Sequence, residues 1–298
     1  MISSDRRRSP PIRRHRAVRQ PAAGGRRTGG GGQGDDSASS RGATGQRRAV
    51  AVDSRARHAG ERVGRPTHWA HRASVRSGHL TSAHTLTWTL FLLGSSTPEV
   101  MRELYEELQT VLGGQPPRPE DLDRLPVLDR VLKESMRTLP ASAYSQRVVA
   151  QPVQLGPFSL QPGAMVIFSQ FITHHLPNLY DQPERFMPDR WKTITPSPYA
   201  YLPFGAGPRM CIGAALGTMQ LKISLATMLS RFKLSVVAGA EIQGNVQSTM
   251  LFPIGRVPVE IGEAGGPFES RPVSGNIHAL VDLPAATRVS EQPLRKAA

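Results

Sequence analysis

The sequence of 298 residues contains a single cysteine, Cys211, and no long hydrophobic run. One cysteine cannot form a disulfide within the chain, which fits a reducing compartment. The longest apolar run, Leu86–Gly94, is far shorter than the roughly 20 residues that a membrane-spanning helix needs. The chain does not open with a charged and then apolar secretory signal. We therefore expect a soluble, cytoplasmic protein without a membrane span.

Residues 1–76 lack Leu, Phe, Tyr and Lys but contain 18 arginines. They carry most of the formal net charge of +14, because residues 77–298 hold 19 basic and 18 acidic side chains. A segment with so few large apolar side chains cannot bury enough surface to offset the entropy of ordering, so we predict disorder. The segment could be a basic tail for anionic polymers or membranes, an organelle transit peptide, or the translation of a GC-rich gene out of frame. Its composition favours the last of these, and we expect no specific nucleic-acid partner.

Apolar residues spaced three and four apart predict helices from Ser77 onward. Turn and capping residues place their ends, since Pro is favoured in the first helical turn and Gly just after the last. The predicted helices cover the apolar segment 80–93, a second that begins at Thr97-Pro98-Glu99 and ends at Gly113-Gly114, a third from Pro126 to Pro140, and a fourth over Ile212–Arg231.

Short strands are predicted over Arg147–Leu155 and Phe158–Phe168, with further strands in Phe232–Ile261. Residues 262–298 are polar with scattered Gly and Pro, and we predict a disordered tail. The expected fold class is therefore mainly α with small β elements, located between residues 77 and 261.

The ten residues Phe204–Gly213 read Phe-Gly-Ala-Gly-Pro-Arg-Met-Cys-Ile-Gly. This segment resembles the cysteine-ligand loop of the cytochrome P-450 family, Phe-x-x-Gly-x-Arg-x-Cys-x-Gly, with all fixed positions filled. From typical residue usage, a chance match in a chain of this length is on the order of 10⁻⁴. The resemblance implies a cytochrome P-450 type fold and a haem b cofactor whose iron takes an axial thiolate from Cys211.

The residue types in this loop suit that chemistry. A thiolate donates electron density to haem iron, and the positive end of the following helix would stabilise the Cys211 anion. By the resemblance, Phe204 packs against the sulfur, Gly207 permits the tight turn, and Gly213 lets the helix approach the porphyrin. Arg209 is expected to pair with a haem propionate.

Three further matches follow the family's order along the chain. Glu134 and Arg137 are spaced as in the family's Glu-x-x-Arg signature, and the resemblance implies a buried pair with Arg190 that has a structural role. Arg147 stands where many members have a second propionate-binding arginine, although a solvated strand residue is an equally good reading.

The segment Ser77–Ser82 resembles the oxygen-activating turn Ala-Gly-x-Asp/Glu-Thr-Thr of the family. The resemblance implies that Thr81 and Ser82 are catalytic hydroxyls and that Gly78 leaves room for dioxygen. Leu80 stands where the family usually has an acid, so one link of a proton relay is absent.

The resemblance covers only the carboxy-terminal part of the family, so we expect an incomplete fold that lacks the amino-terminal half. It implies a haem-thiolate mono-oxygenase in a truncated copy, and we expect the isolated chain to be inactive. Its partners would be a small hydrophobic organic substrate, dioxygen, and a separate ferredoxin or flavoprotein reductase. Two alternatives stay open: a non-oxygenase or peroxide-using haem relative, and a binder of nucleic acid or anionic surfaces through residues 1–76.

Overall fold

A computed structural model describes residues 68–283 of the chain, and all of them belong to the second of two units, 51–298. The predicted disorder of residues 1–67 and 284–298, and any binding by the basic tail, lies outside the described residues. Within the described range no helix is both long and apolar enough to cross a membrane.

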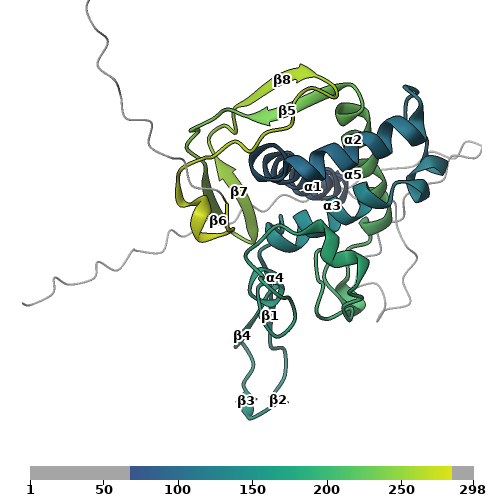
Figure 1. Cartoon of the computed structure of the whole chain (residues 1–298). Helices are drawn as coiled ribbons and strands as arrows, with labels where there is room; N and C mark the ends of the chain where they lie inside the picture. The colour runs from purple at the N-terminus through teal and green to yellow at the C-terminus, as the bar shows by residue number, and fades with distance from the viewer. Residues whose placement is uncertain (1–67, 284–298) are drawn as a thin grey trace, which may run out of the picture. The chain divides into compact units, whose positions relative to one another are not determined.

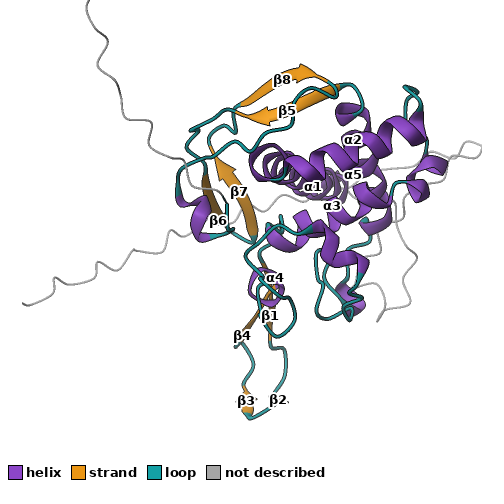
Figure 2. Ribbon diagram, viewed as in Figure 1, coloured by secondary structure: helices purple, strands orange, loops and turns teal. Residues whose placement is uncertain are grey.

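The described chain is mainly helical, as Figures 1 and 2 show. Its α-helices are α1 (His68–Ser96), α2 (Pro98–Leu112), α3 (Pro126–Thr138), α4 (Gln170–His174) and α5 (Ala214–Leu229). Short 3-10 helices are η2 (Pro119–Arg124), η3 (Pro188–Lys192), η4 (Gly207–Arg209) and η5 (Asn276–Ala279).

Helix ends follow the predicted residues at α2 and α3. Pro98 and Pro126 each open a helix, and Gly113 ends α2 in the left-handed conformation. Thr97 occupies the N-cap position, but its side chain makes no capping hydrogen bond. At α3, a residue of the preceding helix provides the cap. The carboxylate of Glu107 in α2 accepts hydrogen bonds from the backbone N–H groups of Val127 and Leu128 at 2.7 and 3.0 Å.

In the part of the chain that the structure describes, eight short strands form four antiparallel pairs. The pairs are β1 (Tyr144–Val148) with β4 (Met165–Ser169), β2 (Val153–Leu155) with β3 (Phe158–Leu160), β5 (Phe232–Val236) with β8 (Val259–Glu263), and β6 (Gln243–Gln247) with β7 (Met250–Ile254). The register places Gln146 opposite Ile167 and Leu234 opposite Ile261.

Between residues 144 and 169 the predicted pair of long strands is wrong in detail. Both are interrupted at the same level, so that β1–β4 and β2–β3 form successive tiers of one projecting hairpin (Figure 1). The interruption falls at Pro152 and Pro162, which lack the N–H group that a continuous ladder needs.

The core surrounds α1. Trp88 is fully buried, and its Nε1 donates to the backbone carbonyl of Leu251 in β7 at 3.1 Å. Thr89 donates to Ser135 Oγ of α3 at 2.7 Å, which satisfies both buried hydroxyls. Burial of each large apolar side chain contributes roughly 1.5–3 kcal/mol. Other fully buried apolar residues are Phe91, Leu104, Leu108, Leu125, Leu128, Leu132 and Leu225.

Both predicted domain boundaries need correction. Helix α1 begins at His68, inside the segment predicted to be disordered, because the Ala and Arg in residues 68–76 favour helix. The predicted tail is also wrong over residues 262–283, which include η5 and the buried side chains of Val273, Ile277, Val281 and Leu283.

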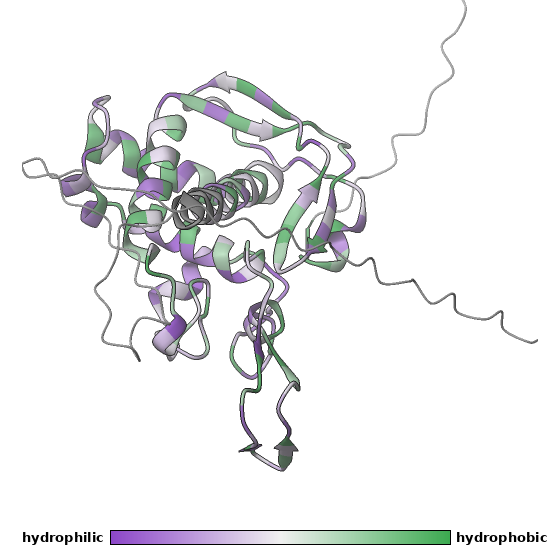
Figure 3. Ribbon diagram, turned by 180° about the vertical axis from the view of Figure 1, so that it is seen from behind, coloured by the Kyte–Doolittle hydropathy of each residue, from purple (hydrophilic) through white to green (hydrophobic). Residues whose placement is uncertain are grey.

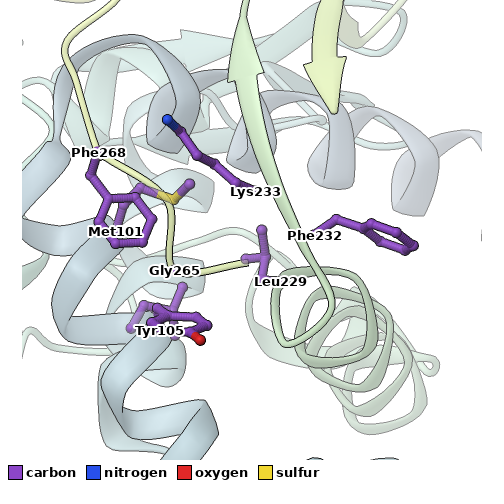
Figure 4. A pocket seen from close by; sticks show the side chains of 8 residues that line it. Met101, Tyr105, Leu229, Phe232, Lys233, Gly265 and Phe268 are labelled. Carbon is purple, nitrogen blue, oxygen red and sulfur yellow. The ribbon is translucent and has the colours of Figure 1, made fainter. Parts of the chain in front are cut away.

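The start of this carboxy-terminal segment passes over α2, where Figure 4 shows the residues around it. Gly265 has φ +75°, and a Cβ there would lie 2.8 Å from the Tyr105 hydroxyl. Phe268 packs with its ring centroid 6.1 Å from that of Tyr105. The cavity left between these residues is about 10 Å³, which holds at most one water molecule. This pocket is a packing defect rather than a ligand site.

Candidate functional site

Cys211 lies on an exposed turn between η4 and α5. The turn is closed by a hydrogen bond from the Cys211 N–H to the Phe204 carbonyl at 2.9 Å, and by one from the Ala214 N–H to the Cys211 carbonyl at 3.4 Å. Gly207 has φ +68° with open space where a Cβ would be, so this position favours glycine for its backbone conformation. The local hydrogen bonds hold the thiol three residues before α5.

Gly213, two residues after Cys211, has no side chain that could cover the sulfur. A Cβ on Gly213 would lie 3.8 Å from Cys211 Sγ, in ordinary van der Waals contact. Phe204 is partly buried against the core, and its Cε1 is 4.0 Å from where a Cβ on Gly217 would lie. The phenyl ring therefore packs beside the first turn of α5.

Side chains around Cys211 suit a large apolar group that carries anions. Ile212 is 96% exposed, and Met210 and Leu216 are more than half exposed. Such apolar exposure beside one thiol is typical of a surface that another group covers. Arg209 is exposed and forms no ion pair or hydrogen bond within residues 68–283. A thiol, an apolar surface and an unpaired guanidinium are the donor set that a haem with its carboxylates needs, so the residues present fit this cofactor.

A buried charge network lies behind the loop. The structure brings Glu134, Arg137 and Arg190 together, with Glu134 and Arg137 fully buried and Arg190 nearly so. Arg137 donates to both oxygens of Glu134, Nε to Oε2 at 3.0 Å and Nη2 to Oε1 at 2.9 Å. Arg190 Nε donates to Oε1 at 2.9 Å. The same carboxylate also accepts from the Met187 N–H and from Trp191 Nε1, each at 2.9 Å.

The two arginines tie this carboxylate to the chain between α4 and η3. Arg137 donates to the backbone carbonyls of His174, Pro183 and Arg185. Arg190 Nη1 donates to the carbonyl of Asp181 at 2.6 Å. The irregular segment after α4 is thus held by side chains, since it has few backbone ladders of its own.

Sequence patterns did not reveal the aromatic groups that complete this network. Trp191 lies with its ring centroid 4.7 Å from that of Tyr201, and the Tyr201 hydroxyl donates to the Lys133 carbonyl at 3.0 Å. The Tyr180 hydroxyl donates to the Ala200 carbonyl at 2.9 Å. Burial raises the pKa of Tyr180 to about 12, so it stays a donor. These residues lie in 171–203, where no hydrophobic period gave a signal.

The turn of α1 with resemblance to an oxygen-activating segment is regular helix. The Thr81 hydroxyl donates to the Ser77 carbonyl at 2.6 Å, and Thr81 and Ser82 are both partly exposed. A Cβ on Gly78 would meet nothing within 4 Å. Leu80 is 49% exposed on this turn. Helix α1 packs against α5, which follows the cysteine turn.

Arg147 lies on β1, in the projecting hairpin (Figure 1). Its side chain is exposed, and Nη1 donates to the neighbouring Gln146 carbonyl at 2.8 Å. The hairpin that carries it exposes many apolar side chains, and Figure 3 shows hydrophobic green along this projecting region. The exposed apolar residues of the hairpin include Val148, Phe158, Met165, Ile167 and Phe168.

Comparison with known proteins shows similarity to one family. The family profile described as Cytochrome P-450 matches residues 75–259. The chain is 36% identical over 182 residues to pentalenene oxygenase from Streptomyces avermitilis, covering 60% of this chain and 40% of that protein. It is 35% identical over 179 residues to cyclooctatin synthase from Streptomyces melanosporofaciens, covering 58% of this chain and 38% of the relative.

A mammalian protein is also similar to this chain. The mitochondrial 1,25-dihydroxyvitamin D(3) 24-hydroxylase of Mus musculus is 33% identical over 182 residues, covering 60% of this chain and 35% of the relative. The chain thus spans about 40% or less of the length of these relatives. Because the family profile covers more than half of the chain, and the helices with small antiparallel sheets agree with it, the chain belongs to the cytochrome P-450 family.

Proposed function

We propose that this chain supplies the haem-binding part of a cytochrome P-450 mono-oxygenase and that Cys211 is the axial thiolate ligand of haem b. The observation that carries the proposal is the exposed thiol on the turn before α5, with an unpaired Arg209 and the exposed Ile212 beside it. Membership of a family whose cofactor is a haem with a cysteine ligand supports the same assignment.

When bound, haem would supply the chemistry by which dioxygen is cleaved and one oxygen atom enters an organic substrate. The chain's own residues would bind and orient it. Cys211 would provide the anionic ligand, and Arg209 would pair with one carboxylate through charge-assisted hydrogen bonds. Arg147 would pair with the other carboxylate, after releasing its local contact with the Gln146 carbonyl. Phe204 would pack against the sulfur, Gly207 would permit the tight turn, and Gly213 would let α5 approach the porphyrin.

On the α1 side, Thr81 and Ser82 would hold exchangeable protons at their hydroxyl oxygens. The Thr81 hydroxyl now donates to its own helix, so it would rotate to donate elsewhere. The substrate would be a small hydrophobic organic molecule, and electrons would come from a separate ferredoxin or flavoprotein reductase. Because apolar side chains such as Ile212 are exposed around the cysteine turn, we propose that further protein surface is needed for a complete site.

A second candidate is a relative that uses peroxide rather than dioxygen. The half-exposed Leu80 favours it, because a leucine cannot donate a proton where an acid would. Positioned acid–base groups contribute roughly 10²–10⁴-fold to rates, so oxygen-driven turnover should suffer more than peroxide-driven turnover. Turnover of the haem-loaded chain with hydrogen peroxide, compared with dioxygen and a surrogate reductase, separates the two functions.

The test of the main proposal is haem ligation. The full chain, loaded with haem and reduced under carbon monoxide, should show the red-shifted Soret band of a thiolate-ligated iron. Cys211→Ser should abolish this band, because an alcohol is not a thiolate donor. Met210→Leu changes a neighbouring exposed side chain on the same turn and should leave the band unchanged. An unaltered band in Cys211→Ser would contradict the assignment.

A further inference from the structure

His174 is a fully buried polar side chain to which the proposed function assigns no role. It is the last residue of α4, and both of its ring nitrogens have backbone partners. Nδ1 lies 3.2 Å from the Arg137 carbonyl, and Nε2 accepts from the Leu202 N–H at 2.7 Å. A carbonyl can only accept and an N–H can only donate, so these partners define a neutral ring with its proton on Nδ1.

The environment keeps the ring in this neutral form. Burial, and then the nearby positive charge of Arg137, lower the pKa of His174 to about 3. Tyr201 stacks on the ring with centroids 5.6 Å apart, and Tyr180 meets it edge-on at 6.5 Å. Arg137 in turn donates to the His174 carbonyl at 2.8 Å. His174 is therefore joined to the buried charge network through both its backbone and its side chain.

From the other ring nitrogen, a short series of hydrogen bonds leads to the cysteine turn. Leu202 donates to His174, and its own carbonyl accepts from the Gly205 N–H at 3.0 Å. Two residues after Leu202, the Phe204 carbonyl accepts the N–H of Cys211 at 2.9 Å. The segment 202–211 forms no strand, and its 3-10 helix η4 spans three residues, so its position depends on such point contacts.

We propose that His174 is a positioning residue that fixes the cysteine turn to the Glu134–Arg137–Arg190 network through its Nε2 acceptor. A neutral imidazole suits this task because it donates to one segment and accepts from another across a rigid ring. It is not a catalytic residue, because it acts only through Leu202. The inference about the turn stands on the hydrogen bonds alone, while its consequence for haem ligation rests on the proposed function.

The experiment compares three variants of the full chain without haem, using hydrogen exchange measured by mass spectrometry. His174→Asn keeps a donor near Nδ1 but cannot reach Leu202, whereas His174→Gln keeps an acceptor near the place of Nε2. His175→Asn is the matched control, since that neighbour bonds only the Phe171 carbonyl of its own helix and its buried Nε2 has no partner among the described residues.

We expect His174→Asn to speed exchange in residues 202–213 about tenfold, which is the scale of one lost buried hydrogen bond. Exchange in α2 should stay at the wild-type rate, as should residues 202–213 in His174→Gln and in the control. Unchanged exchange of 202–213 in His174→Asn would overturn the proposal, as would failure of His174→Gln to restore it. A rise in α2 equal to that in the turn would also overturn it, because His174 would then serve general stability.

A second readout concerns the ligand when haem is loaded. In the reduced carbon-monoxide complex, His174→Asn should lower the fraction of the red-shifted Soret band, and His174→Gln should recover it. If the wild-type chain binds no haem, the proposed function fails. The hydrogen-exchange rates of residues 202–213 still decide whether His174 positions the turn. A turn that loosens in His174→Asn with no loss of the red-shifted band would refute the link between His174 and ligation.

Discussion

At the scale of single residues, Glu134 is a buried carboxylate whose contacts are all charge-assisted or backbone hydrogen bonds. Replacing it by Gln keeps its shape but leaves the guanidinium groups of Arg137 and Arg190 buried without an anion. Breaking one partner of such a network costs about 3–5 kcal/mol, a large share of the stability of a domain. We therefore expect Glu134→Gln to lower the unfolding free energy by about that amount, measured by urea denaturation.

Glu103 offers the matched control for this variant. It pairs with Arg130 at 2.9 Å, but its side chain is 42% exposed. Exposed pairs contribute about 0–1 kcal/mol, so Glu103→Gln should change stability little. Equal effects of the two substitutions would mean that the Glu134 network is no stronger than a surface pair.

His174 also predicts how stability depends on pH. Its pKa is 6.5 in the unfolded chain and is lowered to about 3 by burial and then by Arg137. Between these values the unfolded chain binds a proton that the folded chain excludes, so stability falls as pH drops below 6.5. One such histidine contributes about 1.4 kcal/mol per pH unit, and burial also lowers the pKa values of His175 and His84, which act in the same direction.

This dependence can be measured by urea unfolding at pH 7.5 and 5.5, for wild type and His174→Gln. In His174→Gln the unfolding free energy should depend less steeply on pH, because the contribution of His174 is lost. The contributions of His175 and His84 should remain. A wild-type free energy that stays constant between these two pH values would contradict the assignment of a neutral, buried ring.

At the scale of elements, periodic segments were predictable and aperiodic ones were not. The spacing of apolar residues and the positions of Pro98 and Pro126 place α2 and α3, because local geometry alone decides such helices. The division of the hairpin into two strand pairs was missed. Whether Pro152 interrupts a strand depends on the pairing with the partner strand, which the sequence does not show. For the site, a motif located Cys211, but the contacts of His174 and Trp191 join residues 28 and 57 positions apart. No local pattern encodes such distances.

The segment after β8 gives a prediction about how one element docks on another. Gly265→Ala places a Cβ about as close as 2.8 Å to Tyr105, in a backbone conformation with φ +75°. Gly255 has the same φ of +75° but open space around it, so Gly255→Ala shows the cost of the conformation alone, about 1 kcal/mol. Gly265→Ala should cost roughly 1–3 kcal/mol more in thermal or urea unfolding, because of overpacking. Equal costs would mean that this segment does not rest on α2.

At the scale of the whole molecule, the described part buries a core and still exposes much apolar surface. Exposed apolar side chains gather on the β1–β4 hairpin and on the turn around Cys211, as with Ile167 and Ile212. The family relatives are more than twice as long as the matched region. This exposure agrees with the proposal that further protein surface is needed for a complete site.

The carboxy-terminal boundary of the folded part provides the test at this scale. Ending the chain at residue 261, where composition alone places the boundary, removes four buried side chains: Val273, Ile277, Val281 and Leu283. It also removes the hydrogen bond from the Arg271 N–H to the Ser95 carbonyl at 2.6 Å, at the end of α1. At roughly 1.5–3 kcal/mol for each apolar side chain, the loss is comparable to the whole stability of a domain. We expect the 1–261 chain to show no cooperative thermal transition by circular dichroism, whereas a 1–283 chain keeps these contacts and should melt like the full chain. Cooperative melting of the 1–261 chain at the full-length temperature would mean that the buried positions after β8 contribute nothing to the core.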